Sequence, residues 1–120
     1  RHNKQLINSW YQQRAEIIFR ERFNEVLEKF NCKDRPELVL RKMNKRWGSF
    51  LKYKKIILNP QLIHTSKECI DYVIAHELCH MKYKKHDKRF FDLLQSKVHD
   101  WEKKKDQLES SLNFGNTIFN

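Results

Sequence analysis

The chain has 120 residues, a length that suits one compact domain rather than two. It contains only 2 Gly and 2 Pro, too few for the many tight turns of an all-β sandwich, which argues against that class. The formal net charge of +10 attracts phosphate backbones and acidic proteins, so charge leaves nucleic-acid association through a basic surface open without deciding for it.

Residues 1–30 carry the pattern of an amphipathic helix, with apolar side chains at steps of three and four residues and charged residues on the other face. The apolar positions are Leu6, Ile7, Trp10, Tyr11, Ile17, Ile18, Val26, Leu27 and Phe30. Residues 31–36 end this helix, because Pro36 cannot continue it. Extended segments, rich in β-branched and aromatic residues, follow at residues 37–43, 46–50 and 55–59. We expect them to form a small antiparallel sheet.

A second helix is predicted from about residue 66 to residue 83. Thr65, with Glu68 three residues later, has the pattern of a capping box at its start. One apolar stripe of this helix should face the core and consists of Ile70, Ile74, Leu78 and Met81. His76 and His80 lie on the adjacent stripe, at the edge of the buried face, where a cleft could open.

Asp87 is the expected N-cap of a C-terminal helix. The apolar side of that helix consists of Phe90, Phe91, Leu94, Val98 and Trp101. Residues 109–120 form a polar tail with little pattern.

Cysteine usage and the absence of targeting signals point to a cytoplasmic location. The 3 cysteines are an odd number without zinc-knuckle spacing, so we expect free thiols in a reducing compartment. No apolar run approaches the ~20 residues of a membrane span, no signal peptide is visible, and we expect no membrane association. The chain begins with Arg1 rather than Met, which is consistent with a fragment of a longer chain.

The run HELCH at residues 76–80 predicts the centre of a zinc-hydrolase site. Histidines four residues apart on one helix project in the same direction, so both imidazoles can reach one metal ion at ~2.0–2.1 Å. Glu77 lies about 100° round the helix from His76, where it can hydrogen-bond a zinc-bound water and accept its proton. The alternative is that His76 and His80 are ordinary half-buried helix residues, but the capped, amphipathic helix favours the metal site.

A catalytic zinc site needs a third protein ligand, and His86 is the candidate, six residues after His80. Metzincins use the same spacing, with a Gly three residues after the second His. Here that position is Tyr83, and no Met follows His86 to form the floor of a metzincin site. The metzincin interpretation is therefore rejected.

Short motifs from about residue 41 to residue 108 follow one another in a recognisable order. They are RWGS at residues 46–49, ILN at 57–59, LIH at 62–64, DYVI at 71–74, HELCH at 76–80 and HDKRFF at 86–91. In this order they resemble the YgjP-like metallopeptidase domain, a family related to the SprT-like and WLM proteases. The resemblance implies that His76, His80 and His86 bind one zinc ion per chain and that Glu77 is the catalytic base. It also implies a protein or peptide substrate.

The resemblance further implies that the RWGS motif forms a strand alongside the active-site helix. The chain departs from the family at Phe50, where Cys is usual, at Pro60, where Trp is usual, and at residues 85–87, where Asn-His-Ser is usual. Asp87 can cap a helix as Ser does, so the turn that carries His86 is retained. No departure removes a metal ligand or the base.

Arg46, Tyr72 and Tyr83 are candidates to stabilise the oxyanion that forms when water attacks a carbonyl, and the sequence does not choose among them. Gly48 either permits close approach of a substrate backbone or marks a bulge. Around His86 lies a basic cluster of Lys82, Lys84, Lys85, Lys88 and Arg89. Its default interpretation is a solvated face. The more specific interpretation is that this cluster attracts an acidic or DNA-associated substrate, by analogy with SprT-like proteases, which act on proteins crosslinked to DNA.

The sequence thus predicts a single α+β zincin-like minidomain over residues 1–120: an N-terminal helix, a small antiparallel sheet, the HExxH helix and a C-terminal helix. The predicted function is zinc-dependent hydrolysis of peptide bonds by a Glu-activated, zinc-bound water. The main alternative is a latent or non-catalytic zinc-binding module with a basic, nucleic-acid-binding surface. Hydrolysis of a non-peptide amide is a third alternative.

Overall fold

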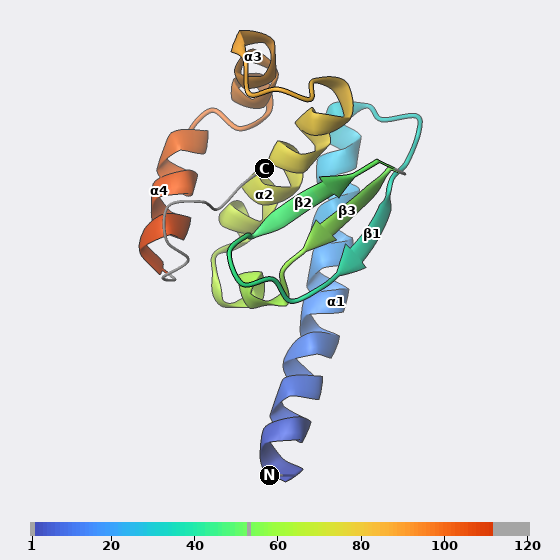
Figure 1. The fold of residues 1–120 in the computed structure, drawn as a ribbon, viewed down its shortest axis with the longest axis vertical. Coiled ribbons are helices and arrows are strands. Elements are labelled where there is room, and N and C mark those ends of the chain that lie inside the picture. Colours follow the sequence, from blue (N-terminus) through green and yellow to red (C-terminus); the bar gives the residue numbers. More distant parts are fainter. Residues whose placement is uncertain (1, 53, 112–120) are drawn as a thin grey trace.

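The structure, a computed structural model, describes residues 2–52 and 54–111 of the chain. It is an α+β fold of four α-helices, one short 3-10 helix and a three-stranded sheet within those residues (Figure 1). The helices are α1 His2–Phe30, α2 Lys67–Lys82, α3 Lys88–Lys97 and α4 Trp101–Ser111, and the 3-10 helix η1 is Pro60–His64. The strands are β1 Glu37–Leu40, β2 Gly48–Leu51 and β3 Lys55–Leu58. The predicted fold class is confirmed.

The sheet has the order β1-β3-β2, so β2 lies at one edge beside the central strand β3. β2 pairs with β3 in antiparallel register, Gly48 opposite Leu58, as predicted. The prediction of a wholly antiparallel sheet is wrong, because β1 runs parallel to β3. Both outer strands pair with β3, and the chain crosses from one edge to the other between them. Residue patterns show where strands lie but do not distinguish the two directions of pairing.

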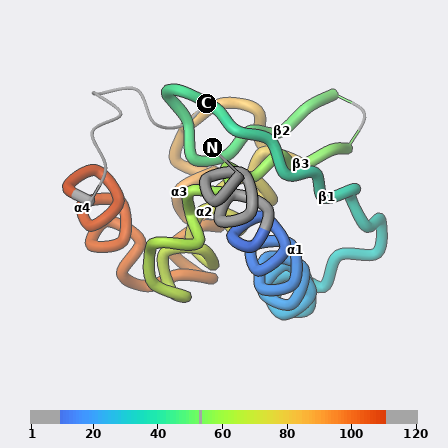
Figure 2. Tube along the Cα trace, turned by 90° about the horizontal axis from the view of Figure 1, so that it is seen from below, coloured from blue at the N-terminus to red at the C-terminus, as the bar shows by residue number. Residues whose placement is uncertain are grey.

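Helices α1 and α2 lie on the same face of the sheet, and α4 lies on the side of α2 opposite to α1 (Figures 1 and 2). Helix α2 contacts every other helix as well as β2 and β3, which makes it the central element of the fold. All residues from 72 to 80 are buried. The two-stripe description of α2 was therefore too narrow, because this helix is enclosed on nearly all sides.

The buried face of α1 consists of Ala15, Phe19, Phe23, Val26 and Leu27. The first half of α1 projects beyond the sheet (Figure 1). Three apolar residues of the predicted pattern are exposed: Trp10 at 55%, Tyr11 at 38% and Ile17 at 64%. Ile17 lies in sequence between the fully buried Ala15 and Phe19, so it is on the opposite face of the helix. Leu6 and Ile7, also in that pattern, have no described side chains.

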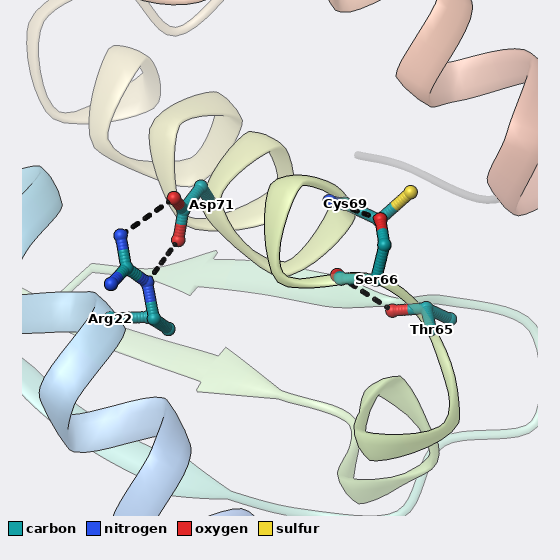
Figure 3. A network of polar contacts seen from close by, with 5 residues as sticks. All are labelled: Arg22, Thr65, Ser66, Cys69 and Asp71. Atoms are coloured by element: carbon teal, nitrogen blue, oxygen red, sulfur yellow. Dashed lines mark hydrogen bonds and ion pairs between the residues drawn. The ribbon is translucent and has the colours of Figure 1, made fainter.

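An ion pair joins α1 to α2 at the level of the first turns of α2 (Figure 3). Nε and Nη2 of Arg22 each donate to one carboxylate oxygen of Asp71, both at 2.8 Å. The guanidinium has a raised pKa because of this hydrogen bonding to Asp71. The N-cap of α2 is Ser66, whose Oγ accepts from the backbone N–H of Cys69. The predicted N-cap, Thr65, is thus one residue too early. Its hydroxyl instead donates to the carbonyl of Leu62 in η1 at 2.8 Å.

The predicted C-terminal helix is divided into α3 and α4 by a turn at residues 98–100. This turn lets the Trp101 ring stack on Phe91 at 5.1 Å while its Nε1 donates to Gln95. Helix α4 continues to Ser111, so the predicted polar tail begins in a helix, and residues 112–120 lie outside the described residues. Cys32, Cys69 and Cys79 are free thiols, as expected. No helix in the described ranges combines the length and apolar character required to cross a membrane.

Candidate metal centre

The structure brings His76, His80 and His86 into one cluster. The first two lie a turn apart on α2, both buried, with ring centroids 5.2 Å apart. His86, in the connection between α2 and α3, places its Nε2 3.0 Å from Nε2 of His80. One ring nitrogen from each residue lies within 4.8 Å of the other two. Within the described residues, no other trio of His, Cys, Asp or Glu side chains is arranged in this way.

The three imidazoles fit a single zinc ion. Two nitrogens bound tetrahedrally at ~2.0–2.1 Å lie ~3.3 Å apart, so only small side-chain adjustments separate the observed cluster from that arrangement. Partial burial and the neighbouring His80 lower the pKa of His86. A lowered pKa favours the neutral imidazole, which is the form that binds a metal ion.

The connection between α2 and α3 holds His86 over α2 because both of its ends are fixed. Tyr83 follows the last residue of α2 in extended backbone and donates its N–H to the carbonyl of Cys79 at 2.9 Å. Asp87 caps α3, as predicted, by accepting the backbone N–H of Phe90 at 3.2 Å. That hydrogen bond lowers the pKa of the Asp87 carboxyl. The turn that brings His86 to the histidine cluster is thus defined by the start of α3.

Phe90 forms an apolar wall against the whole cluster. Its ring centroid lies 5.0 Å from that of His76, 4.7 Å from His80 and 4.8 Å from His86. The ring is fully buried and restricts the orientations open to the imidazoles. The sequence placed Phe90 on an apolar helix face without linking it to the site. Phe90 follows the Asp87 cap by three residues, close in sequence to His86, and this closeness could have linked it to the site.

Glu77 is enclosed between α2 and β2. Its carboxylate is fully buried and has no hydrogen-bond partner among the described residues. Burial raises its pKa from 4.5 to about 8, and the positive charge of Arg46 opposes this shift. A Cβ on Gly48 would lie 2.8 Å from Val73 Cγ1 and 3.2 Å from Glu77 Oε2. Gly48 therefore permits close packing of β2 on α2, which neither of its two predicted roles included.

The loop before β2 is held by the buried side chain of Asn59. Its Nδ2 donates to the carbonyls of Met43 at 2.8 Å and Arg46 at 3.0 Å, and its backbone N–H donates to the carbonyl of Trp47 at 2.9 Å. These bonds fix the backbone from which Arg46 projects and from which β2 begins at Gly48. Asn59 belongs to the ILN motif, but its function in the loop depends on long-range contacts that the sequence does not reveal.

A cleft of about 690 Å³ opens between β2 and the C-terminal end of α2. Its lining combines basic residues with an apolar pair: Arg46, Phe50, Lys52, Lys54, His80, Met81 and Lys84. His80 connects this cleft to the histidine cluster. Arg46, the first oxyanion candidate, is therefore exposed beside the cluster.

The other candidates lie less favourably for contact with a substrate. Tyr72 is buried in the core, its ring 6.0 Å from that of His76, and burial together with the negative charge of Glu77 raises its pKa. Tyr83 is half-buried, with the Arg89 guanidinium 5.2 Å from its ring. Cys79 is buried, which raises its pKa to about 12.

A family model for the YgjP-like metallopeptidase domain matches residues 1–111. The chain belongs to this family. A comparison with curated proteins gives no significant match.

Two solved structures are similar in fold to this YgjP-like chain. One is the metallopeptidase zymogen abylysin of Pyrococcus abyssi, with a TM-score of 0.72, 19% identity, and coverage of 78% of this chain and 94% of that one. The other is the metallopeptidase zymogen jannalysin of Methanocaldococcus jannaschii, with a TM-score of 0.63, 26% identity, and coverage of 75% and 95%. The likeness to abylysin supports the fold alone. The family match supports metallopeptidase activity for this chain.

Proposed function

We propose that this YgjP-like domain is a zinc-dependent peptidase in which His76, His80 and His86 bind one zinc ion and Glu77 is the general base. The observation that carries the proposal is the histidine cluster, whose ring nitrogens converge within 4.8 Å. Three nitrogen ligands suit zinc and leave one coordination position for water or substrate. When bound there, zinc supplies Lewis-acid chemistry that makes water acidic and polarises a carbonyl.

Glu77 is suited to move a proton because no hydrogen-bond donor among the described residues competes for its carboxylate. Its burial also raises its affinity for a proton. We assign it two transfers: it accepts a proton from the attacking water and then delivers that proton to the leaving amine. Gly48 leaves room for this carboxylate, because a Cβ there would lie 3.2 Å from Glu77 Oε2.

The substrate backbone is proposed to lie along the outer edge of β2. This strand is at the edge of the sheet, so its outer N–H and C=O groups can pair with an extended peptide. The cleft between β2 and the end of α2 gives such a peptide a path past His80. Of the three oxyanion candidates we retain Arg46, because it lines this cleft whereas Tyr72 is enclosed in the core.

The test compares zinc-loaded wild type with Glu77→Gln on a broad set of unfolded proteins and peptides. We expect equal zinc content and a rate at least ~100-fold lower for Glu77→Gln, because the general base is lost while the ligands remain. Glu68→Gln, in the first turn of the same helix and exposed, is the matched control and should cleave like wild type. Identical behaviour of wild type and Glu77→Gln would instead support the latent zinc-binding module. A cytoplasmic location, supported by the three free thiols, stays a prediction.

A further inference from the structure

The cleft beside His80 has a one-sided charge. Four of its lining residues are basic, namely Arg46, Lys52, Lys54 and Lys84, and none is acidic. Lys54 already forms an ion pair with Asp34. In the described part of the chain, no ion pair engages the other three. Arg46 interacts electrostatically with Glu77. Lys52 and Lys84 are therefore the cations of the cleft that lack a counter-charge among the described residues.

The cations lie on two walls of the path proposed for the substrate. Lys52 follows β2, and Lys84 follows the C-terminal end of α2, towards which β2 points (Figure 1). Gly48 is at the end of β2 that packs on Glu77. Lys52 is four residues further along the chain, which corresponds to ~13 Å at 3.3 Å per residue of extended backbone. An extended peptide covers that distance in about four residues. A substrate side chain within four residues of the cleaved bond can thus reach the space between the two lysines.

The floor of the cleft suits a short side chain that ends in a charge. Phe50 lies on the same face of β2 as Gly48, two residues on, and lines the cleft together with Met81. Apolar surface of this kind packs on methylene groups, while lysines at the rim bind a carboxylate at their end. Aspartate and glutamate combine these two features. A nucleic-acid backbone offers phosphates but no strand edge to pair with β2.

We infer that Lys52 and Lys84 determine specificity and that the domain prefers substrates with an acidic side chain within about four residues of the cleaved bond. This inference rests on the proposed peptidase function. Charge-assisted hydrogen bonds in a partly enclosed cleft should raise kcat/KM for an acidic peptide about 10- to 100-fold over its neutral counterpart. The preference should arise locally, rather than from the overall charge of +10.

The experiment uses peptides that differ only in Glu, Gln or Lys at one position within four residues of a mapped cleavage site. Wild type is compared with the double variant Lys52→Glu/Lys84→Glu. The matched control is Lys33→Glu/Lys103→Glu, at two exposed positions outside the cleft lining, which changes the net charge equally. We expect wild type and the control to prefer Glu over Gln at least 10-fold, and the cleft variant to prefer Lys. Equal losses in both double variants would overturn the inference, as would a wild type indifferent to the substituted residue.

A binding measurement keeps the inference testable independently of hydrolysis. Zinc-loaded Glu77→Gln protein is titrated with the same fluorescent peptides and with a DNA oligonucleotide of equal charge. Tighter binding of the Glu peptide, lost on reversal of Lys52 and Lys84, supports the inference even if no cleavage is detected, and in that case the proposed catalysis alone fails. Tighter binding of the oligonucleotide through the same lysines would overturn the choice of an acidic peptide.

Discussion

The burial of Glu77 predicts that its conversion to glutamine stabilises the metal-free protein. The carboxylate is fully buried and has no hydrogen-bond partner among the described residues, and its pKa is raised from 4.5 to about 8. The folded state therefore holds a proton that the unfolded state releases at neutral pH. Stability of the wild type is lost as pH rises from 4.5 towards 8, because the unfolded chain ionises first. Glutamine has nearly the same shape but carries no charge at any of these pH values.

The pKa values set the size of the effect. At pH 7 the raised pKa of Glu77 corresponds to a penalty of about 3 kcal/mol, and at pH 5 to less than about 1 kcal/mol. Glu77→Gln should remove most of this penalty, so its free energy of unfolding should exceed that of wild type by about 3 kcal/mol at pH 7. For a domain of this length the gain corresponds to about 10 °C in Tm.

The assay is urea denaturation of the chelator-treated proteins at pH 5 and pH 7, followed by circular dichroism. Glu68→Gln, exposed in the first turn of α2, is the control and should change the free energy of unfolding by less than ~1 kcal/mol. If Glu77→Gln is no more stable than wild type at pH 7, or if its advantage does not shrink at pH 5, then burial does not raise the pKa of Glu77 as described. The gain in stability should accompany the loss of hydrolysis, because one substitution removes both the buried ionisable group and the proposed general base.

Three further substitutions test the framework of the site. His86→Ala should weaken zinc binding by more than ~100-fold in chelator competition, and full occupancy would remove His86 from the ligand set. Gly48→Ala places a methyl group 2.8 Å from Val73 Cγ1, so we expect a loss of about 1–3 kcal/mol in urea denaturation, and unchanged stability would show that the packing is looser than described. Asn59→Ala removes the donor to two part-buried carbonyls in the loop before β2, which should cost about 1–3 kcal/mol in thermal denaturation. A loss below ~0.5 kcal/mol would refute its anchoring role.

The helix that carries the chemistry could be predicted closely from local signals. The periodicity of apolar residues, a capping side chain and the four-residue step from His76 to His80 are all properties of one helix. The cap itself was assigned one residue early, because Thr65 is followed three residues later by Glu68, which gives it the pattern of a capping box that Ser66 lacks. Only the preceding 3-10 helix decides between them, since its carbonyl engages the Thr65 hydroxyl.

The rest of the fold depends on contacts between distant segments. The parallel pairing of β1 with β3 follows from a crossover of the chain, which the strand residues do not encode. The break between α3 and α4 is accompanied by a tertiary contact, the stacking of Trp101 on Phe91, which helical periodicity does not reveal. Ile17 is exposed because it lies on the face of α1 opposite to the buried Ala15 and Phe19, and the packing of the helix decides which face is covered.

In the site, too, some features follow from local sequence signals and others from contacts between distant segments. His86 was a candidate from its spacing alone, yet its approach to within 3.0 Å of His80 depends on the cap of α3. Contact of Gly48 with Glu77 and the cleft beside β2 both require the sheet to pack on α2. Sequence motifs thus identified the histidines of the cluster, whereas the groups that hold and surround them depend on tertiary packing.

Titration of the metal-free protein with zinc, with hydrolysis of an acidic peptide measured at each step, tests the assignment of the histidine cluster and Glu77 most directly. Activity should be absent at the start, rise in proportion to added zinc and level off at one ion per chain. Glu77→Gln should bind the same single ion and remain inactive throughout. Hydrolysis by the metal-free protein, or equal hydrolysis by both zinc-loaded proteins, would contradict a zinc peptidase that uses Glu77 as its base.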